Sequence, residues 1–175
     1  SSHRRQRQMC IRDSPCTQAK LDQFNIPMMN SNGGDELGTP FATSIDAIEG
    51  ATTGMSVNDR LATIKTFLSD KSEPKSLAQP GHLFPLRARA GLLTERRGHT
   101  EGSIEIIRLA GLKEVGVIIE IMDEFGKMIK GEALKQFAKI YNLTFVSIEE
   151  LYDEVYNKNS SGSVPLSAVD EETLE

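Results

Sequence analysis

The sequence predicts a single domain of the α+β class. Its 175 residues are enough to bury one core without help from disulfides or metals. Apolar residues make up 38% and charged residues 26%, which is typical of a soluble globular protein. Segments with helical periodicity and short β-branched runs both occur, and no internal repeat is visible. We therefore expect helices and strands packed around one core.

Charge is unevenly distributed along the chain. The formal charge is −5 in total, but residues 1–14 hold four arginines against one aspartate, so the remainder carries −8. An acidic body argues against nucleic acid as the main partner. A local basic cluster suggests a compact anionic ligand instead; it consists of Arg87, Arg89, Arg96 and Arg97.

The cysteine content and the hydropathy indicate a cytoplasmic protein. Cys10 and Cys16 lie close together with no further cysteine, so the sequence supports neither a disulfide framework nor a zinc ribbon. No apolar run approaches transmembrane length, and no signal-type hydrophobic segment follows the arginine-rich start. We expect no membrane partner.

Three segments differ in composition. Residues 1–16 are predicted to be foreign to the fold, as an artefactual extension would be, because their first fourteen positions show neither helical nor strand periodicity. Residues 17–156 have the pattern of a domain. Residues 157–175 are rich in serine, glycine and acids, so we expect a disordered tail or linker.

The first half of the domain begins with a short helix over residues 19–24, which ends before Pro27. A half-buried strand is predicted over residues 41–48. Ser56 then caps a helix whose inward positions are Val57, Leu61, Ile64 and Leu68. The turn between them, residues 49–54, is rich in hydroxyl groups and glycine, and such turns either surround a phosphate or simply connect two elements.

The second half contains three predicted helices and two predicted strands. The helices are a segment that Thr100 caps and Gly111 ends, a segment over 132–141 with Leu134, Phe137, Ala138 and Tyr141 inward, and a segment over 149–156 that Ser147 caps. The strands are 115–122, the most hydrophobic run in the chain, and 143–148. Residues 123–126 are predicted to form a hairpin turn.

Residues 96–101, Arg-Arg-Gly-His-Thr-Glu, carry the strongest signal for a site. The free N–H groups at a helix N-terminus attract phosphate, and two guanidinium groups add positive charge. His99 is in addition a metal-capable imidazole. The alternative is an ordinary capped surface helix preceded by solvated arginines.

Two further residues are candidates for proton transfer. His82 lies in a rigid segment between Pro80 and Pro85, where a fixed imidazole serves as an acid, a base or a hydrogen-bond donor, or else as a satisfied structural residue. Glu120 lies inside the apolar run, where a buried carboxylate is costly unless it is paired, protonated or facing a polar cavity. The alternative is that Glu120 lies at a strand end or on an exposed edge.

Four motifs in one order and at one spacing resemble 3,4-dihydroxy-2-butanone 4-phosphate synthase of riboflavin biosynthesis. They occupy residues 38–41, 49–60, 80–88 and 96–101, and the resemblance extends over residues 17–156. The resemblance implies an α+β fold with a mixed β-sheet and flanking helices, and a homodimer. It also implies a lyase that uses Mg²⁺ or Mn²⁺ to convert D-ribulose 5-phosphate into L-3,4-dihydroxy-2-butanone 4-phosphate and formate.

The resemblance also implies roles for individual residues. His99 corresponds to a metal ligand, and the residues around the substrate and its phosphate are Arg96, Arg97, Gly98, His99, Thr100 and Glu120. His82 and Glu120 correspond to the two residues needed for proton transfer. A metal in such a site polarises the ketose oxygens and stabilises an enediolate.

The sequence departs from the family pattern in three places. Arg97 stands where the family usually has glycine, and neither cysteine falls at the position of the family's strand cysteine. The family's N-terminal acidic loop, which supplies a second metal ligand, has no counterpart. Two hypotheses follow: the chain represents a phosphosugar lyase, as the larger part of a longer polypeptide, or a truncated, catalytically silent domain that acts as a binding or structural partner.

Overall fold

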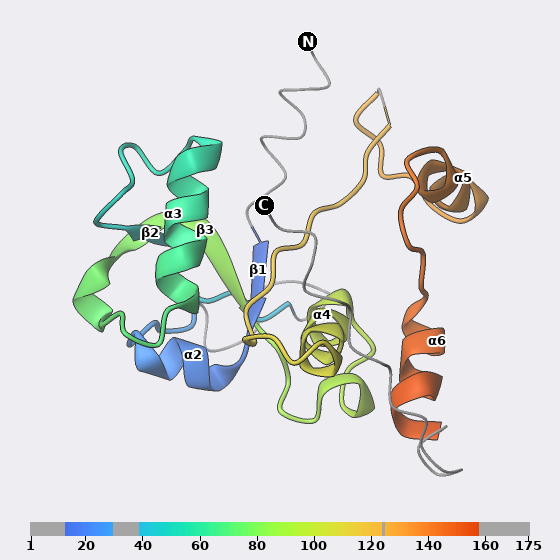
Figure 1. Cartoon of the computed structure of the whole chain (residues 1–175), viewed down its shortest axis with the longest axis horizontal. Coiled ribbons are helices and arrows are strands. Elements are labelled where there is room, and N and C mark those ends of the chain that lie inside the picture. Colours follow the sequence, from blue (N-terminus) through green and yellow to red (C-terminus); the bar gives the residue numbers. More distant parts are fainter. Residues whose placement is uncertain (1–12, 30–38, 124, 158–175) are drawn as a thin grey trace, which may run out of the picture. The chain divides into compact units, whose positions relative to one another are not determined.

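The computed structural model describes residues 13–29, 39–123 and 125–157 (Figure 1). Contact clustering divides the chain into two compact units, Ser1–Phe145 and Val146–Glu175. The larger unit contains β1 (Asp13–Cys16), α2 (Gln18–Gln23), β2 (Ile45–Ala47), α3 (Val57–Leu68), η1 (Pro74–Ser76), β3 (Leu77–Arg87), η2 (Leu92–Thr94), α4 (His99–Leu109) and α5 (Glu132–Ile140). The smaller unit contains α6 (Ile148–Tyr152) and η3 (Asp153–Asn157). Within the described ranges, no helix is long and apolar enough to cross a membrane.

The sheet is mixed, as expected for this α+β fold. β3 is its central strand: β1 pairs with it in parallel and β2 pairs with it antiparallel. Residues 115–118 form an additional extended segment alongside β1, through antiparallel bridges from Val115 to Cys16 and from Ile118 to Asp13. The sequence indicated a rigid segment around residues 80–86, and the structure makes it part of the longest strand.

The predicted start of the domain at Thr17 is wrong by at least four residues. Asp13–Cys16 forms β1, and its Ser14 and Cys16 are fully buried. The Ser14 hydroxyl donates a hydrogen bond to the Gly116 carbonyl oxygen at 2.7 Å. A four-residue strand with Asp, Ser and Pro has almost no apolar alternation, so its pairing partners, rather than its own sequence, make it a strand. Residues 1–12 and 158–175 lie outside the described part, as do the predicted loop residues 30–38.

Helix α3 begins where its capping chemistry predicts, but only half of its predicted inward positions face the core. Ser56 caps it through a reciprocal pair of hydrogen bonds with Asp59. Ile64 and Leu68 pack partly buried against the core, whereas Val57 and Leu61 are exposed. The buried residues are Asp59, Arg60, Thr63 and Phe67. The reason is that Thr63 Oγ1 accepts a hydrogen bond from the Ala47 N–H of β2, so the polar side of the helix is tied to the sheet.

The core lies between the sheet, α2 and α3. The rings of Phe24 and Phe67 pack 5.5 Å apart at its centre, and Leu21, Ile45 and Leu83 are buried around them. A second, smaller cluster lies under α4 and consists of Ala88, Leu92 and Ile104. The two clusters lie at opposite ends of β3, because Leu77, the first residue of the strand, belongs to the first and Ala88, which directly follows the strand, to the second.

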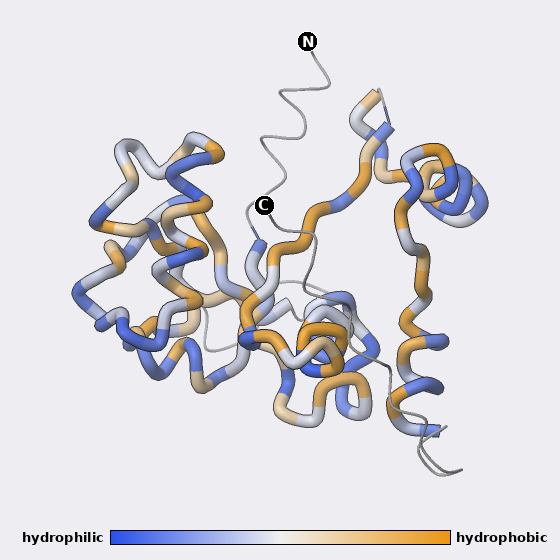
Figure 2. Tube along the Cα trace, in the orientation of Figure 1, coloured by the Kyte–Doolittle hydropathy of each residue, from blue (hydrophilic) through white to orange (hydrophobic). Residues whose placement is uncertain are grey.

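The predicted buried strand over residues 115–122 is only partly present. The segment is strongly hydrophobic and extended in Figure 2, yet only Val115 is buried, while Val117 is 40% and Ile119 49% exposed. Within the described residues the segment pairs with β1 through isolated bridges only. The segment bridges to β1 along one edge, and one of its two faces is not covered by other described residues, so alternate side chains are exposed. Hydrophobicity alone does not reveal this arrangement.

The helices predicted around Gly111, Gly131 and Ser147 are present. Leu109 ends α4 before Gly111, Gly131 precedes α5, and Ser147 caps α6 with Glu150. The predicted inward face of α5 is confirmed at Ala138, which is buried, and at Leu134 and Phe137, which are partly buried, but it is wrong at Tyr141, which is 54% exposed. Residues 143–147 do not form the predicted strand, and α6 is followed by one π-helical turn. The turn after Met122 is confirmed by backbone hydrogen bonds between Asp123 and Lys127.

Candidate active site

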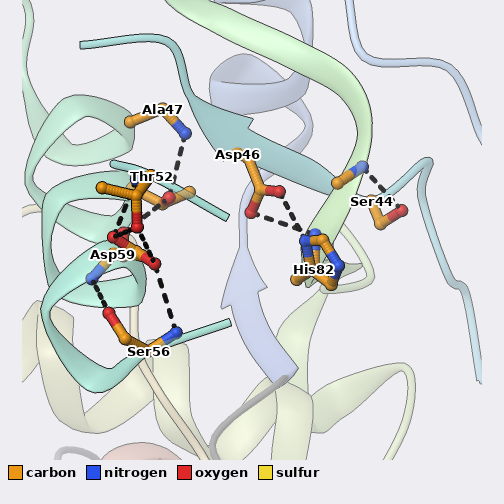
Figure 3. Close-up of polar contacts among 9 residues, drawn as sticks. Ser44, Asp46, Ala47, Thr52, Ser56, Asp59 and His82 are labelled. Carbon is orange, nitrogen blue, oxygen red and sulfur yellow. Dashed lines mark hydrogen bonds and ion pairs between the residues drawn. The ribbon is translucent and has the colours of Figure 1, made fainter. Parts of the chain in front are cut away.

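His82 lies on β3 in a tightly built polar contact with Asp46 of β2 (Figure 3). Asp46 Oδ2 lies 2.6 Å from His82 Nδ1, and Asp46 Oδ1 accepts the His82 backbone N–H at 3.0 Å. The imidazole is nearly half exposed, whereas the Asp46 carboxylate is only 15% exposed. The ring is therefore fixed on one side and open to a ligand on the other.

An irregularity in strand pairing produces this contact. Ile45 pairs with Leu83, but the next residue, Asp46, pairs with Ala78, so four residues of β3 have no partner on β2. Bulges of this kind re-aim side chains. The Gly81 N–H donates to Ser44 Oγ at 3.1 Å, which holds the bulged backbone against β2.

The loop between β2 and α3 closes over the same contact. Asp59 accepts hydrogen bonds from the Thr52 backbone N–H and from Ser56, and these bonds hold the loop onto the start of α3 (Figure 3). The Thr52 backbone hydrogen bond is the main cause that lowers the pKa of Asp59 to about 2. The loop thus keeps a fixed shape around a permanently charged carboxylate, which is a structural role. The phosphate-binding interpretation of this loop stays a prediction.

The 96–101 motif forms the start of α4, although its cap differs from the prediction. Gly98 occupies the cap position and makes no side-chain hydrogen bond, and the helix begins at His99. Thr100 is buried inside the first turn and does not cap it. A glycine cap leaves first-turn N–H groups without a side-chain acceptor, which is the arrangement that attracts an anion.

Arg96 is held in place by a buried acid. Glu101 is completely buried, and its Oε2 lies 2.7 Å from Arg96 Nη1. Its other oxygen accepts the Arg89 backbone N–H at 3.1 Å. A Cβ on Gly98 would lie 2.2 Å from Arg96 Nη1, so glycine is needed here for the ion pair to form. The arginine side chain is about one quarter exposed.

The strand register brings His82 and Glu120 to the same end of the sheet. Phe84 and Ile118 both pair with Asp13, which puts them in one row about 10 Å apart. His82 precedes Phe84 by two residues, and Glu120 follows Ile118 by two residues. Because the segment that contains Ile118 runs antiparallel to β3, both residues lie on the same side of this row. Glu120 is exposed, which is the second of the two alternatives that the sequence left open.

The structure does not join these two residues to the 96–101 motif. Among the described residues, the polar side-chain contacts of His82 run to Asp46. Glu101 contacts the chain at Arg89, beyond the C-terminal end of β3, whereas His82 lies five residues before that end. Two separate groups therefore result, with His82 and Glu120 in one and Arg96 and His99 in the other.

The described residues do not complete a site for a divalent metal. Residues 13–29, 39–123 and 125–157 contain no cluster of three or more His, Cys, Asp or Glu side chains suited to a metal ion. His99 is exposed and offers one ligand, but Glu101 beside it is fully committed to Arg96 and Arg89. Burial raises the pKa of the Cys16 thiol to about 12, so it does not supply a thiolate.

Two residues of these groups escaped the sequence-based search. Asp46 belongs to a predicted strand, and a single acid there gives no signal unless the bulge that turns it toward His82 is known. Glu101 is placed by the motif in the first helical turn, which suggests an exposed acid that complements the helix dipole. Its burial follows from the loop at residues 88–98, which folds back over it.

Comparisons with known proteins identify the family of this chain. The family model for 3,4-dihydroxy-2-butanone 4-phosphate synthase matches residues 8–154. Relatives of that name from Vibrio cholerae and Pseudomonas putida are 42% and 44% identical, over 77% of this chain and 62% of their own length. The chain thus spans less than two thirds of the length of these relatives.

Solved structures of the same name give TM-scores of 0.75 and 0.76. The first, from Candida albicans, is 34% identical and matches 82% of this chain and 70% of its own. The second, described as a complex with two magnesium ions, is 31% identical and matches 84% of this chain and 74% of its own. A family match over most of the chain and a shared fold lead to one conclusion: the chain belongs to the 3,4-dihydroxy-2-butanone 4-phosphate synthase family.

Proposed function

We propose that this chain provides the core of a lyase that converts D-ribulose 5-phosphate into L-3,4-dihydroxy-2-butanone 4-phosphate and formate in riboflavin biosynthesis. The observation that carries the proposal is the family match over residues 8–154, which includes both groups of site residues. The alternative, a catalytically silent domain with the same fold, has no observation in its favour.

The start of α4 is the proposed phosphate site. The Arg96 guanidinium and the first-turn N–H groups present positive charge and directed donors to an anion. Gly98 lets the backbone approach closely, and Arg97 adds a second guanidinium. Because the Thr100 side chain is buried, its backbone N–H rather than its hydroxyl is the donor we assign to the phosphate.

His82 and Glu120 are the proposed proton-transfer residues. Both are exposed on the sheet end that they share, so both are accessible to a substrate. An imidazole and a carboxylate are suited to remove a proton from one substrate atom and return it to another. Isomerisations of a ketose need such transfers at neighbouring carbons.

His99 is the proposed ligand of Mg²⁺ or Mn²⁺. The solved relative with two magnesium ions supports a metal in this fold. A bound divalent ion polarises ketose oxygens and stabilises negative charge on them. Hard cations prefer several oxygen ligands, so the remaining ligands must come from outside the described residues.

We further propose a cytoplasmic homodimer. Two groups of site residues that one chain keeps apart are brought together if each site takes one group from each subunit. Exposed apolar residues along the 115–122 segment, Val117 and Ile119 among them, supply surface for such a contact. A buried, unpaired Cys16 thiol is compatible with a reducing compartment.

The test joins this chain to the part of the Vibrio cholerae relative that precedes the matched region. The purified chimera is assayed for formate release from ribulose 5-phosphate, with and without EDTA. We expect metal-dependent turnover that His99→Ala removes. A chimera that folds, by circular dichroism and by a cooperative thermal transition, but releases no formate would support the silent domain instead.

A further inference from the structure

We propose that Asp46 is a positioning residue that fixes the ring and the tautomer of His82, so that Nε2 is the atom that exchanges protons with a substrate. The tautomer assignment stands on the contacts of this chain alone. Its consequence for turnover rests on the function proposed above.

The tautomer follows from hydrogen-bond chemistry. An ionised carboxylate has only acceptor atoms, and both oxygens of Asp46 face donors of His82. Oδ1 takes the backbone N–H, so Oδ2, at 2.6 Å from Nδ1, requires the ring proton on Nδ1. Nε2 is then left with its lone pair, on the exposed side of the ring.

The surroundings pack closely against this pair. A Cβ on Gly54 would lie 2.1 Å from Asp46 Oδ2 and 2.5 Å from His82 Nδ1, so the loop backbone lies directly against both groups. A Cβ on Gly81 would lie 2.2 Å from the Ile45 carbonyl carbon. The loop backbone and the two strands thus pack against the side of the pair that carries Oδ2 and Nδ1, while the rest of the ring stays exposed (Figure 3).

This geometry defines a proton path in which Nε2 takes one proton from the substrate and later returns it. Nε2 removes a proton from the substrate and the ring becomes an imidazolium ion, whose charge the adjacent carboxylate stabilises. Asp46 keeps its charge throughout and takes no proton. The imidazolium then returns the proton from Nε2 to another substrate atom, which restores the neutral Nδ1–H ring.

The substitution that tests this is Asp46→Asn, which keeps the size of the side chain. The amide oxygen remains the acceptor for the His82 backbone N–H, and the amide nitrogen then faces Nδ1 as a donor. Nδ1 must become an acceptor, so the ring proton moves to Nε2. A reversed tautomer of this kind in serine proteases lowers kcat by about 10⁴-fold.

The first measurement is a long-range ¹H–¹⁵N correlation spectrum of the histidine-labelled 175-residue chain at about pH 8, above the ordinary histidine pKa of about 6.5. His82→Asn identifies the signals of His82 among the three histidines. We expect a protonated Nδ1 and a bare Nε2 in the natural sequence, and the opposite pattern in Asp46→Asn. A natural chain with Nε2 protonated overturns the proposal.

The second measurement is kinetic and uses the chimera. Asp46→Asn should lower kcat by about 10²- to 10⁴-fold with little change in KM, because the substrate phosphate binds elsewhere. The matched control is Asp70→Asn, which removes a carboxylate that pairs with Lys20 and Lys113 on the surface. We expect it to change neither the His82 tautomer nor kcat.

The outcomes separate the two proposals. Unchanged kcat in Asp46→Asn together with a reversed tautomer overturns the role of Asp46 in turnover. A chimera without any formate release overturns the proposed function, while the spectrum of the 175-residue chain still decides how Asp46 holds His82.

Discussion

Glu120 is the residue for which sequence and structure differ most. The sequence suggested a carboxylate inside a buried strand. In the structure Glu120 is exposed, and it follows Ile118, which pairs with Asp13, by two residues. An exposed carboxylate keeps its hydration and is accessible to a substrate. The role proposed for Glu120 therefore does not require its burial.

We expect Glu120→Gln to abolish turnover of the chimera and to leave the fold unchanged. The amide does not accept a proton from carbon or oxygen, and replacing an exposed side chain typically changes stability by less than about 0.5 kcal/mol. Formate release and a urea titration measure the two effects. Near-normal turnover in the variant would assign Glu120 to the surface and leave His82 as the proton-transfer residue.

Gly54 is expected to be more sensitive to substitution than other glycines with positive φ. Its φ is +77°, and a methyl group would meet the Asp46–His82 pair at 2.1–2.5 Å. Gly111 has a φ of +67°, but a Cβ at this position would have no other atom of the described residues within 4 Å apart from its chain neighbours, so Gly111 is the matched control. Gly111→Ala should cost about 1 kcal/mol from backbone strain alone.

Gly54→Ala should cost clearly more than that, about 2–4 kcal/mol, because the close contact adds to the strain. Urea unfolding of both variants measures the difference. Equal losses would mean that the loop moves aside freely and does not enclose the pair.

At the scale of elements, the Asp59 carboxylate at the N-terminus of α3 makes folding stability depend on pH. Asp59 has a pKa lowered to about 2, mainly through the Thr52 backbone N–H, compared with an ordinary value of 3.8. A lowered pKa in the folded state means that the charged form stabilises folding above about pH 4. This stabilisation declines as the pH falls from about 4 to about 2 and is absent below the lower value.

We therefore expect Asp59→Asn to be less stable than the natural chain at about pH 7, and the gap between them to shrink as the pH falls from about 4 to about 2. Urea titrations across this range provide the measurement. Asp70→Asn serves as the comparison, because the pKa of Asp70 is also lowered, but by hydrogen bonds from Lys113 and Lys20. A gap for Asp59→Asn that stays constant with pH would contradict the assignment of its stabilisation to the ionised carboxylate.

A single substitution at the N-terminus of α4 changes both its proposed phosphate binding and its structural ion pair. Arg96→Ala should raise KM for ribulose 5-phosphate, but it also leaves the buried Glu101 without its partner, and an unpaired buried charge costs about 3 kcal/mol or more. The double substitution Arg96→Ala with Glu101→Gln removes the charge and the penalty together.

We expect the double variant to recover most of the stability but to keep the raised KM, with kcat less affected than KM. Steady-state kinetics of the chimera and denaturant unfolding give the two quantities. If KM returns to normal along with stability, Arg96 supports the loop and does not hold the phosphate.

Elements with capping signals were predictable, and elements that depend on distant partners were not. Ser56, Gly131 and Ser147 mark helix starts through local hydrogen bonds or backbone conformation, which the sequence encodes directly. β1 and the 115–118 segment become part of the sheet only through each other and β3. Local sequence carries little information about such pairing.

The same distinction applies to the site. The motif residues were found because four short patterns occur at one spacing. Asp46 lies outside these patterns, and the contacts of Gly54 and Glu101, which lie inside them, were not predicted, since they arise from a close backbone approach and a folded-back loop. The residues proposed to contact ligand thus have a sequence signature, whereas the contacts that position them depend on tertiary structure.

At the scale of the whole molecule, metal binding is the property on which the proposed activity depends most. The described residues offer His99 but no cluster of three or more His, Cys, Asp or Glu that would surround a divalent ion. We expect the 175-residue chain to bind Mg²⁺ weakly in isothermal titration calorimetry and to release no formate from ribulose 5-phosphate. One imidazole provides neither the number nor the kind of ligand that Mg²⁺ prefers.

We expect the chimera to bind the ion more tightly, because the resemblance implies that the family's N-terminal acidic loop supplies a second metal ligand. His99→Ala in the chimera should weaken binding by about 10-fold or more and abolish formate release, while His3→Ala, which removes a histidine outside the site motifs, should do neither. Metal-dependent turnover by the 175-residue chain alone would show that acids such as Asp35 and Glu36 complete the site. The added segment would then be needed for stability or assembly, and His99 would not depend on it for the remaining metal ligands.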